Sequence, residues 1–152
     1  MDQYSLRKCH SAQPNGPLCQ CFDRSARIRS GLMTYVIGSA CVDVMDKSCV
    51  RECPVDCIYE GKRSLYINPD ECVDCGACKL ICRVDAIYHE TDLPDAQRWH
   101  LTDNREFFSE TLPGRDRALG TPGGAGILGP VGVDTHLIKA LPPHGPSKAS
   151  DR

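Results

Sequence analysis

A chain of 152 residues with a formal net charge of −2 contains 11 cysteines, 13 glycines and 11 prolines, and only 6% of its residues are aromatic. This composition does not favour a large packed core, and small domains of this kind are commonly stabilised by disulfides or bound metal. Residues 33–95 carry six basic and twelve acidic side chains, and this acidic balance argues against nucleic-acid binding, which requires a basic surface.

The cysteines are better explained by metal than by disulfides. The N-terminal residues lack the apolar run of a secretion signal, and no apolar stretch is long enough to cross a membrane. The number of cysteines is odd, so complete disulfide pairing within the chain is impossible. We therefore expect a reduced, cytoplasmic protein without a membrane segment, whose thiolates bind metal.

Residues 1–32 are polar and rich in arginine, without hydrophobic periodicity, and are predicted to form a disordered N-terminal extension. The organised pattern begins at Met33, which is therefore a candidate for the true start. The extension contains Cys9, Cys19 and Cys21. The CQC spacing is tighter than the usual C-x₂₋₄-C metal motif, so we assign these cysteines no role.

Residues 33–94 contain eight cysteines and an internal repeat. The segment CPVDCIY at 53–59 matches CRVDAIY at 82–88 with an offset of 29 residues, and Cys49 matches Cys78 at the same offset. A repeat of this length corresponds to one supersecondary unit. Two copies predict a small domain with pseudo-two-fold symmetry.

Short strand signals complete this domain. Residues 35–37, 58–59, 65–67 and 87–88 are rich in β-branched and aromatic side chains. The second and third of these flank residues 60–64, which contain a glycine, and together they predict a hairpin. The fold class that follows is α+β, with short hairpins around the metal centres.

Residues 95–112 have a helical pattern in which Trp99, Phe107, Phe108 and Leu112 share a face, and Pro113 follows. We expect a helical lid on the small domain, with a possible interruption at residues 102–103. Trp99 and the neighbouring His100 are interpreted as packing or surface residues rather than as ligands.

Residues 113–152 form the C-terminal part, in which 14 of 40 residues are glycine or proline. Residues 120–134 are predicted to lack regular structure, because freezing so many glycines costs backbone entropy. A loosely wrapped tail is the favoured interpretation. The apolar residues of 136–141 allow a short docking segment as the alternative.

The central motif is C-x₂-C-x₂-C-x₃-C, formed by Cys72, Cys75, Cys78 and Cys82. In this spacing the first three thiolates bind one iron–sulfur cluster and the fourth binds a neighbouring cluster. Cys53 holds the fourth position of the first repeat, so by symmetry it completes the cluster of the second repeat. These four thiolates, from Cys53, Cys72, Cys75 and Cys78, predict a [4Fe–4S] centre.

Cys82 in turn is expected to join Cys41 and Cys49 at a second centre. The position at which the first repeat needs one more thiolate is occupied by Val44, which cannot bind iron. Three thiolates suit a [3Fe–4S] cluster, which lacks one corner. The spacing therefore predicts two different clusters in one domain.

Two other interpretations are less consistent with the pattern. Structural zinc sites use C-x₂-C pairs separated by longer spacers, whereas these cysteines are crowded and repetitive. An iron–sulfur redox sensor would need an output domain, and no helix-turn-helix or basic patch is present in the sequence. Cys57 remains outside both ligand sets, and we interpret it as a small buried residue beside a cluster.

At these residues the sequence closely resembles the bacterial seven-iron ferredoxins, particularly their actinobacterial subgroup. The resemblance extends from about Met33 to Asp134, with Arg83 in a position where many two-cluster ferredoxins have proline. It is carried by the segments MTYVIG, CVDVMDKSCVRECPVDCIYEG, LYINPDECVDCGACKLIC, DNREFF and LPG.

The resemblance implies an electron carrier rather than an enzyme, with one [3Fe–4S] and one [4Fe–4S] cluster. It implies the ligand sets given above and places Cys57 as a non-ligating neighbour of the four-iron cluster. The implied partners are a flavin-dependent ferredoxin reductase and acceptors such as cytochromes P450, and we expect a monomer. An apolar shell is expected around the clusters, formed by Val36, Ile58, Leu65, Ile67, Ile81 and Ile87.

Overall fold

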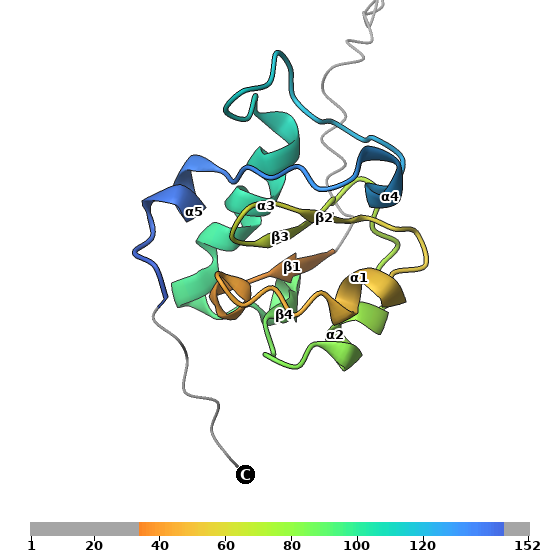
Figure 1. Ribbon diagram of the computed structural model, residues 1–152. Helices are drawn as coiled ribbons and strands as arrows, with labels where there is room; N and C mark the ends of the chain where they lie inside the picture. Colours follow the sequence, from red (N-terminus) through yellow and green to blue (C-terminus); the bar gives the residue numbers. More distant parts are fainter. Residues whose placement is uncertain (1–33, 145–152) are drawn as a thin grey trace, which may run out of the picture. The chain divides into compact units, whose positions relative to one another are not determined.

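The computed structural model describes residues 34–144, and the N-terminal extension with Cys9, Cys19 and Cys21 lies outside this part of the chain. The described residues form four short strands, five helices and three 3₁₀ turns, arranged as in Figure 1. The strands are β1 (Tyr35–Ile37), β2 (Ile58–Glu60), β3 (Leu65–Ile67) and β4 (Ile87–His89). The helices are α1 (Ser48–Glu52), α2 (Ala77–Ile81), α3 (Trp99–Ser109), α4 (Ala125–Leu128) and α5 (His136–Ala140).

The strands form two separate antiparallel pairs. β2 pairs with β3, with Tyr59 opposite Tyr66, which confirms the hairpin predicted around residues 60–64. β1 pairs with β4, with Val36 opposite Tyr88. This second pairing joins the two ends of the cysteine-rich region, because all of the cysteines from Cys41 to Cys82 follow β1 and precede β4 in the sequence.

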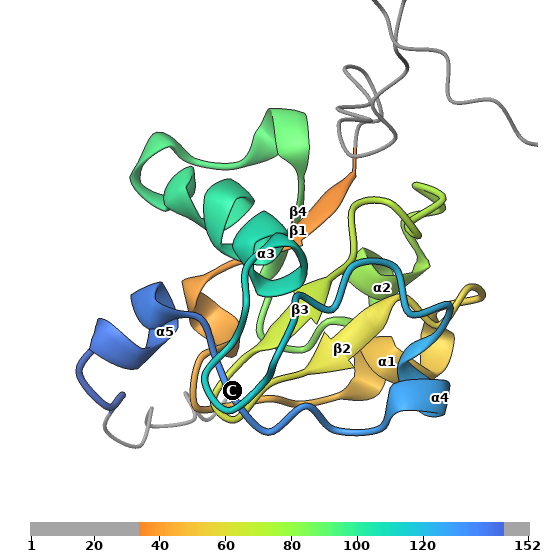
Figure 2. The ribbon, with the colours of Figure 1, turned by 90° about the horizontal axis from the view of Figure 1, so that it is seen from above.

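Helices α1 and α2 lie side by side, as Figures 1 and 2 show. Each has five residues, and each follows a residue in the left-handed conformation, Lys47 with φ 61° and Gly76 with φ 74°. Cys49 lies within α1 and Cys78 within α2, and the next residue after each helix is a cysteine too, Cys53 or Cys82. The same arrangement of cysteines therefore occurs at both helices.

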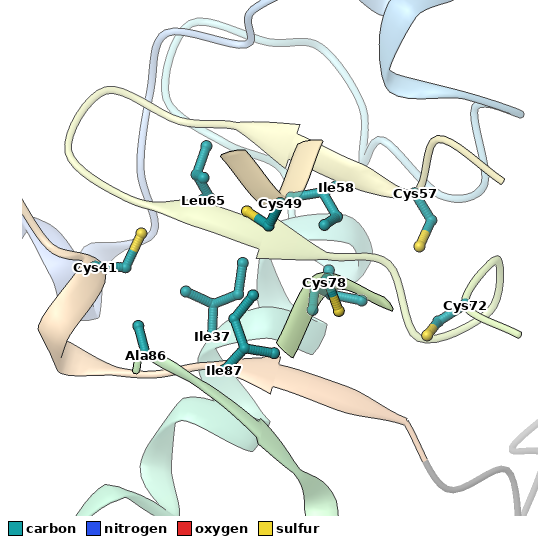
Figure 3. Packing of buried hydrophobic residues seen from close by; sticks show 11 residues of the cluster. Ile37, Cys41, Cys49, Cys57, Ile58, Leu65, Cys72, Cys78, Ala86 and Ile87 are labelled. Atoms are coloured by element: carbon teal, nitrogen blue, oxygen red, sulfur yellow. The ribbon is translucent and has the colours of Figure 1, made fainter. Parts of the chain in front are cut away.

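The β2–β3 hairpin is buried on both faces, because alternate side chains of a strand point to opposite sides. One face contributes Ile58, Leu65 and Ile67 to a core with buried cysteines, which Figure 3 shows. The other face contributes Tyr59 and Tyr66 to a second core with α3 and α5. The prediction that Ile81 belongs to the apolar shell is wrong, because this residue at the end of α2 is 40% exposed.

Helix α3 covers the second core. It runs without interruption through residues 102–103, whereas residues 95–97 form a 3₁₀ turn before it. Phe107 is fully buried and stacks on Tyr66, with 3.8 Å between ring centroids, and Trp99 and Leu112 belong to the same cluster as predicted. His100 is a buried packing residue. The domain boundaries at residues 94 and 112 stay predictions.

The segment after α3 corrects the sequence analysis. It contains helix α4 within residues 120–134, and α5 forms the docking segment that was only the alternative prediction. Backbone hydrogen bonds join Ala125 N–H to the carbonyl of Asp56 at 2.7 Å and Val131 N–H to that of Glu60 at 2.8 Å. The sequence prediction failed because these bonds come from backbone groups, which any composition can supply.

Candidate metal centre

One pocket gathers the cysteines of the predicted four-iron centre. Its lining includes Cys53, from the end of α1, together with Cys72, Cys75 and Cys78 from the second repeat. Cys57 also lines the pocket. The structure thus brings together the four residues that the spacing assigned to one cluster, although they come from two halves of the chain.

The chemistry of this pocket fits an iron–sulfur cluster. Apart from the thiols, its walls include apolar side chains such as Val55, Ile58 and Ile67, which keep water away. Gly76 leaves no room for a side chain at this left-handed residue, because a Cβ there would lie 2.9 Å from the hydroxyl oxygen of Tyr35. Thiolates held in a dry, tightly turned loop are the ligands that such clusters use.

Backbone N–H groups donate to sulfur at corresponding positions of the two repeats. The N–H of Cys57 donates to Cys53 Sγ at 3.4 Å, and the N–H of Ala86 donates to Cys82 Sγ at 3.3 Å. Such hydrogen bonds favour the thiolate form and raise the reduction potential of a bound cluster, because they offset negative charge on sulfur. The sulfur atoms of Cys53 and Cys82 are thus stabilised in the same way, each by one backbone N–H group.

Cys57 differs from the other cysteines of the pocket. It is almost fully buried, and its Sγ lies 3.5 Å from Cys53 Sγ. A hydrogen bond to Cys72, followed by burial, raises the pKa of the Cys57 thiol, whereas the same hydrogen bond lowers the pKa of Cys72 to about 5. The Cys57 thiol thus lies in the same pocket as two of the proposed ligands, Cys53 and Cys72, and contacts the Sγ of Cys53.

The second group contains Cys41, Cys49 and Cys82. Cys41 and Cys49 are buried, and Cys82 packs against the same core. Burial, together with the charges of the neighbouring thiols, raises the pKa of Cys41 to about 11 and that of Cys49 to about 12. Val44, which stands where a fourth thiolate would be needed, is 42% exposed. Figure 3 shows Cys41 at one end of the buried core and Cys57 and Cys72 at the other.

Over residues 34–144, no three His, Cys, Asp or Glu side chains converge closely enough to hold a single metal ion. A cluster differs from a single ion, because each thiolate binds a different iron atom and the sulfur atoms stand further apart. In the same part of the chain, no helix is long and apolar enough to cross a membrane.

A small domain of helices and strands with a pocket lined by cysteines of both repeats defines a candidate iron–sulfur protein. Comparison with known proteins supports this class. Residues 65–88 match the family described as 4Fe-4S binding domain. A ferredoxin of Mycobacterium tuberculosis is 73% identical over 110 residues, which are 72% of this chain and 96% of that protein.

Two further relatives extend the comparison. A ferredoxin of Saccharopolyspora erythraea is 55% identical over 113 residues, covering 74% of this chain and 99% of that protein. A protein of Hydrogenibacillus schlegelii named Ferredoxin 7Fe is 50% identical over 78 residues, covering 51% of this chain and all of that protein. The chain belongs to the bacterial ferredoxins. Its Mycobacterium and Saccharopolyspora relatives are ferredoxins of actinobacteria. Ferredoxins are iron–sulfur proteins that carry electrons.

Proposed function

We propose that this ferredoxin carries single electrons with two different clusters. Cys53, Cys72, Cys75 and Cys78 hold a [4Fe–4S] cluster, and Cys41, Cys49 and Cys82 hold a [3Fe–4S] cluster. The observation that carries this proposal is the pocket in which Cys53 of the first repeat meets the three cysteines of the second. The name of the Hydrogenibacillus relative, Ferredoxin 7Fe, gives further support for seven irons.

The two halves are proposed to be related by a pseudo-two-fold axis. The supporting observations are the equal lengths of α1 and α2 and the N–H···S bonds to Cys53 and Cys82, which lie 29 residues apart. Under this symmetry each half supplies one thiolate ligand to the cluster of the other half. The single difference in ligation is Val44, which leaves the first centre one thiolate short.

When bound, the clusters supply one-electron oxidation and reduction. The protein holds them by thiolates, donates backbone N–H groups to sulfur and excludes water with apolar side chains. Cys57 is a non-ligating neighbour of the four-iron centre in this scheme, with its Sγ 3.5 Å from that of Cys53. No substrate is transformed in this scheme, so the protein acts as a carrier rather than as an enzyme.

The proposed partners are a flavin-dependent ferredoxin reductase as donor and oxidoreductases such as cytochromes P450 as acceptors. Residues 33–95 carry an excess of six acidic side chains, and thiolate-bound clusters add negative charge. A protein with this charge associates rapidly and weakly with basic surfaces. We propose that it works as a monomer, without nucleic acid or membrane.

The experiment that tests this function is protein-film voltammetry combined with reduction by a ferredoxin reductase. Two reversible one-electron waves, and turnover that slows as ionic strength rises, are expected for the carrier. A cluster that is lost on mild oxidation, with a change in partner binding, would instead identify a redox sensor. A colourless protein containing zinc would refute both iron–sulfur functions.

A further inference from the structure

The two proposed centres lie in segments of opposite charge balance. Residues 52–78 hold the four-iron ligands and contain six carboxylates and two basic residues, Lys62 and Arg63. Segments 39–51 and 79–87 hold the three-iron ligands and contain three acidic and four basic residues. Of the six carboxylates, only that of Glu60 pairs with a lysine, Lys47, at 2.5 Å. The negative charge of the cysteine-rich region is thus concentrated at the four-iron side.

The same side exposes apolar side chains and a thiol. Val55 and Val73 line the four-iron pocket and reach the surface, with Val73 57% exposed. Cys75 is an exposed cysteine of the same pocket, whereas Cys41 and Cys49 of the other centre are buried. Among the described cysteines, Cys75 is the most exposed, so a proposed cluster ligand reaches the surface on this side.

The C-terminal segment adds a third apolar residue to this side. Asp56, the residue after Val55, binds α4 twice: its carbonyl accepts from Ala125 N–H at 2.7 Å, and its carboxylate accepts from Gly126 N–H at 2.6 Å. These bonds position Ile127, which is 80% exposed. Figures 1 and 2 show α4 beside the region of α1 and β2. Ile127 thus extends the apolar surface of Val55 and Val73 beyond Asp56.

We propose that Val55, Val73, Cys75 and Ile127, with the surrounding carboxylates of Asp56, Asp70 and Asp74, form a docking face for a redox protein whose apolar patch has a basic rim. This inference rests on the proposed carrier function and specifies where the partner binds. An apolar centre with a charged rim is the usual anatomy of a protein interface. One electron leaves the reduced four-iron centre beside Cys75 and reduces the partner by one electron, without bond formation or proton transfer.

The test uses intact ferredoxin, reduced anaerobically and mixed in a stopped-flow instrument with a basic c-type cytochrome as the acceptor. Asp70→Asn combined with Asp74→Asn should lower the second-order rate constant about 10-fold at low salt. At roughly 0.5 M salt the double variant and the wild type should have nearly equal rate constants, because salt screens the lost attraction. Ile127→Ser should lower it about 3- to 10-fold at both salt concentrations, because apolar contact is not screened.

Matched controls lie outside the docking face. Asp85→Asn removes one negative charge, against two in the double variant, from a residue that shares the left-handed backbone of Asp74, with φ 49° against 57°. Leu80→Ser removes the most exposed large apolar side chain among the described residues, at 90% exposure. Both controls should keep the wild-type rate constant, and absorbance should show intact clusters in every variant.

Unchanged rates in the Asp70/Asp74 and Ile127 variants would overturn the docking face, as would equal losses in the two controls. These outcomes are distinct from a failure of the proposed function. If wild-type protein with intact, reduced clusters passed no electron to the cytochrome, the carrier function itself would be refuted, together with the docking face that depends on it.

Discussion

The Sγ atoms of Cys53 and Cys57 lie 3.5 Å apart at the same pocket, although only one of the two is proposed to bind iron. The Cys57→Ala variant should keep its full iron content, because the ligand set does not include this thiol. Loss of the thiol that contacts Cys53 Sγ should lower the reduction potential of the four-iron centre, since sulfur then keeps more negative charge. Iron analysis and voltammetry test this prediction.

The double variant Cys53→Ala/Cys57→Ala is the matched comparison. It removes both thiols on this side of the pocket, so a neighbouring thiol cannot replace the lost ligand. We expect loss of the four-iron centre and about three irons per chain, the complement of a cuboidal [3Fe–4S] cluster. If Cys57→Ala alone lost this centre, the assignment of Cys57 as a non-ligand would be wrong.

Removal of iron should unfold the domain. Five cysteines belong to the core shown in Figure 3, and each of the four strands has only three residues. Such short strands do not stabilise a domain by themselves, so the metal–thiolate bonds contribute folding free energy. Chelated protein should lose near-ultraviolet circular dichroism and dispersed amide signals. A chelated chain with a native spectrum would contradict this prediction, and untreated anaerobic protein is the control.

Asn104 of α3 links the two strand pairs. Its side-chain oxygen accepts from Ile67 N–H of β3 at 3.1 Å, and its amide donates to the Ile37 carbonyl of β1 at 3.3 Å. Asn104→Ala leaves both buried backbone groups unpaired, which should lower the free energy of unfolding by about 2–4 kcal/mol. Thr102→Ala, at an exposed position of the same helix, should have little effect in the same denaturant titration.

Arg63 joins the first cysteine loop to the C-terminal segment. Its guanidinium donates to the Asp43 carboxylate at 2.7 Å and to the carbonyls of Ile138 and Leu141, both at 2.9 Å. In Arg63→Gln, amide hydrogen exchange should accelerate in α5 and leave the β1–β4 pair unchanged. Equal acceleration in both places would show global destabilisation rather than release of this segment.

The ion pair between Arg63 and Asp43 predicts how the stability of the folded state depends on pH. Hydrogen bonds from Arg63 hold the pKa of Asp43 well below its ordinary value. A depressed carboxylate pKa stabilises the folded state above the unfolded-state value, about 4, and this stabilisation is lost as the pH falls below it. The difference in denaturation midpoint between wild type and Asp43→Asn should therefore stay constant from about pH 8 to 5. A difference that vanished within this range would contradict the assignment.

The sequence predicted the parts of the fold that local patterns determine. The hairpin of β2 and β3 follows from strand-forming residues around a glycine, and cysteine spacing indicated the four cysteines that meet at one pocket. The pairing of β1 with β4 was not predicted, because it joins residues about 50 positions apart and no local pattern specifies it.

In the C-terminal segment, by contrast, the local pattern led to a wrong prediction. Its glycines indicated a loose tail, but glycine N–H groups bind the carboxylates of Asp56 and Glu71, and Asp134 accepts from the turn N–H groups of Lys62 and Arg63. An acidic domain beside a glycine-rich segment was the available signal. The prediction considered the entropy cost of ordering the segment and not the hydrogen bonds that compensate it.

The most direct test of the central claim counts iron and sulfide in anaerobically purified protein and records its electron paramagnetic resonance spectrum. The proposed ligand sets predict seven irons per chain and a signal in the oxidised state from the three-iron centre, since the oxidised four-iron centre is diamagnetic. Eight irons without a signal in the oxidised state would contradict the account, because Val44 would then have to stand at a complete four-iron centre.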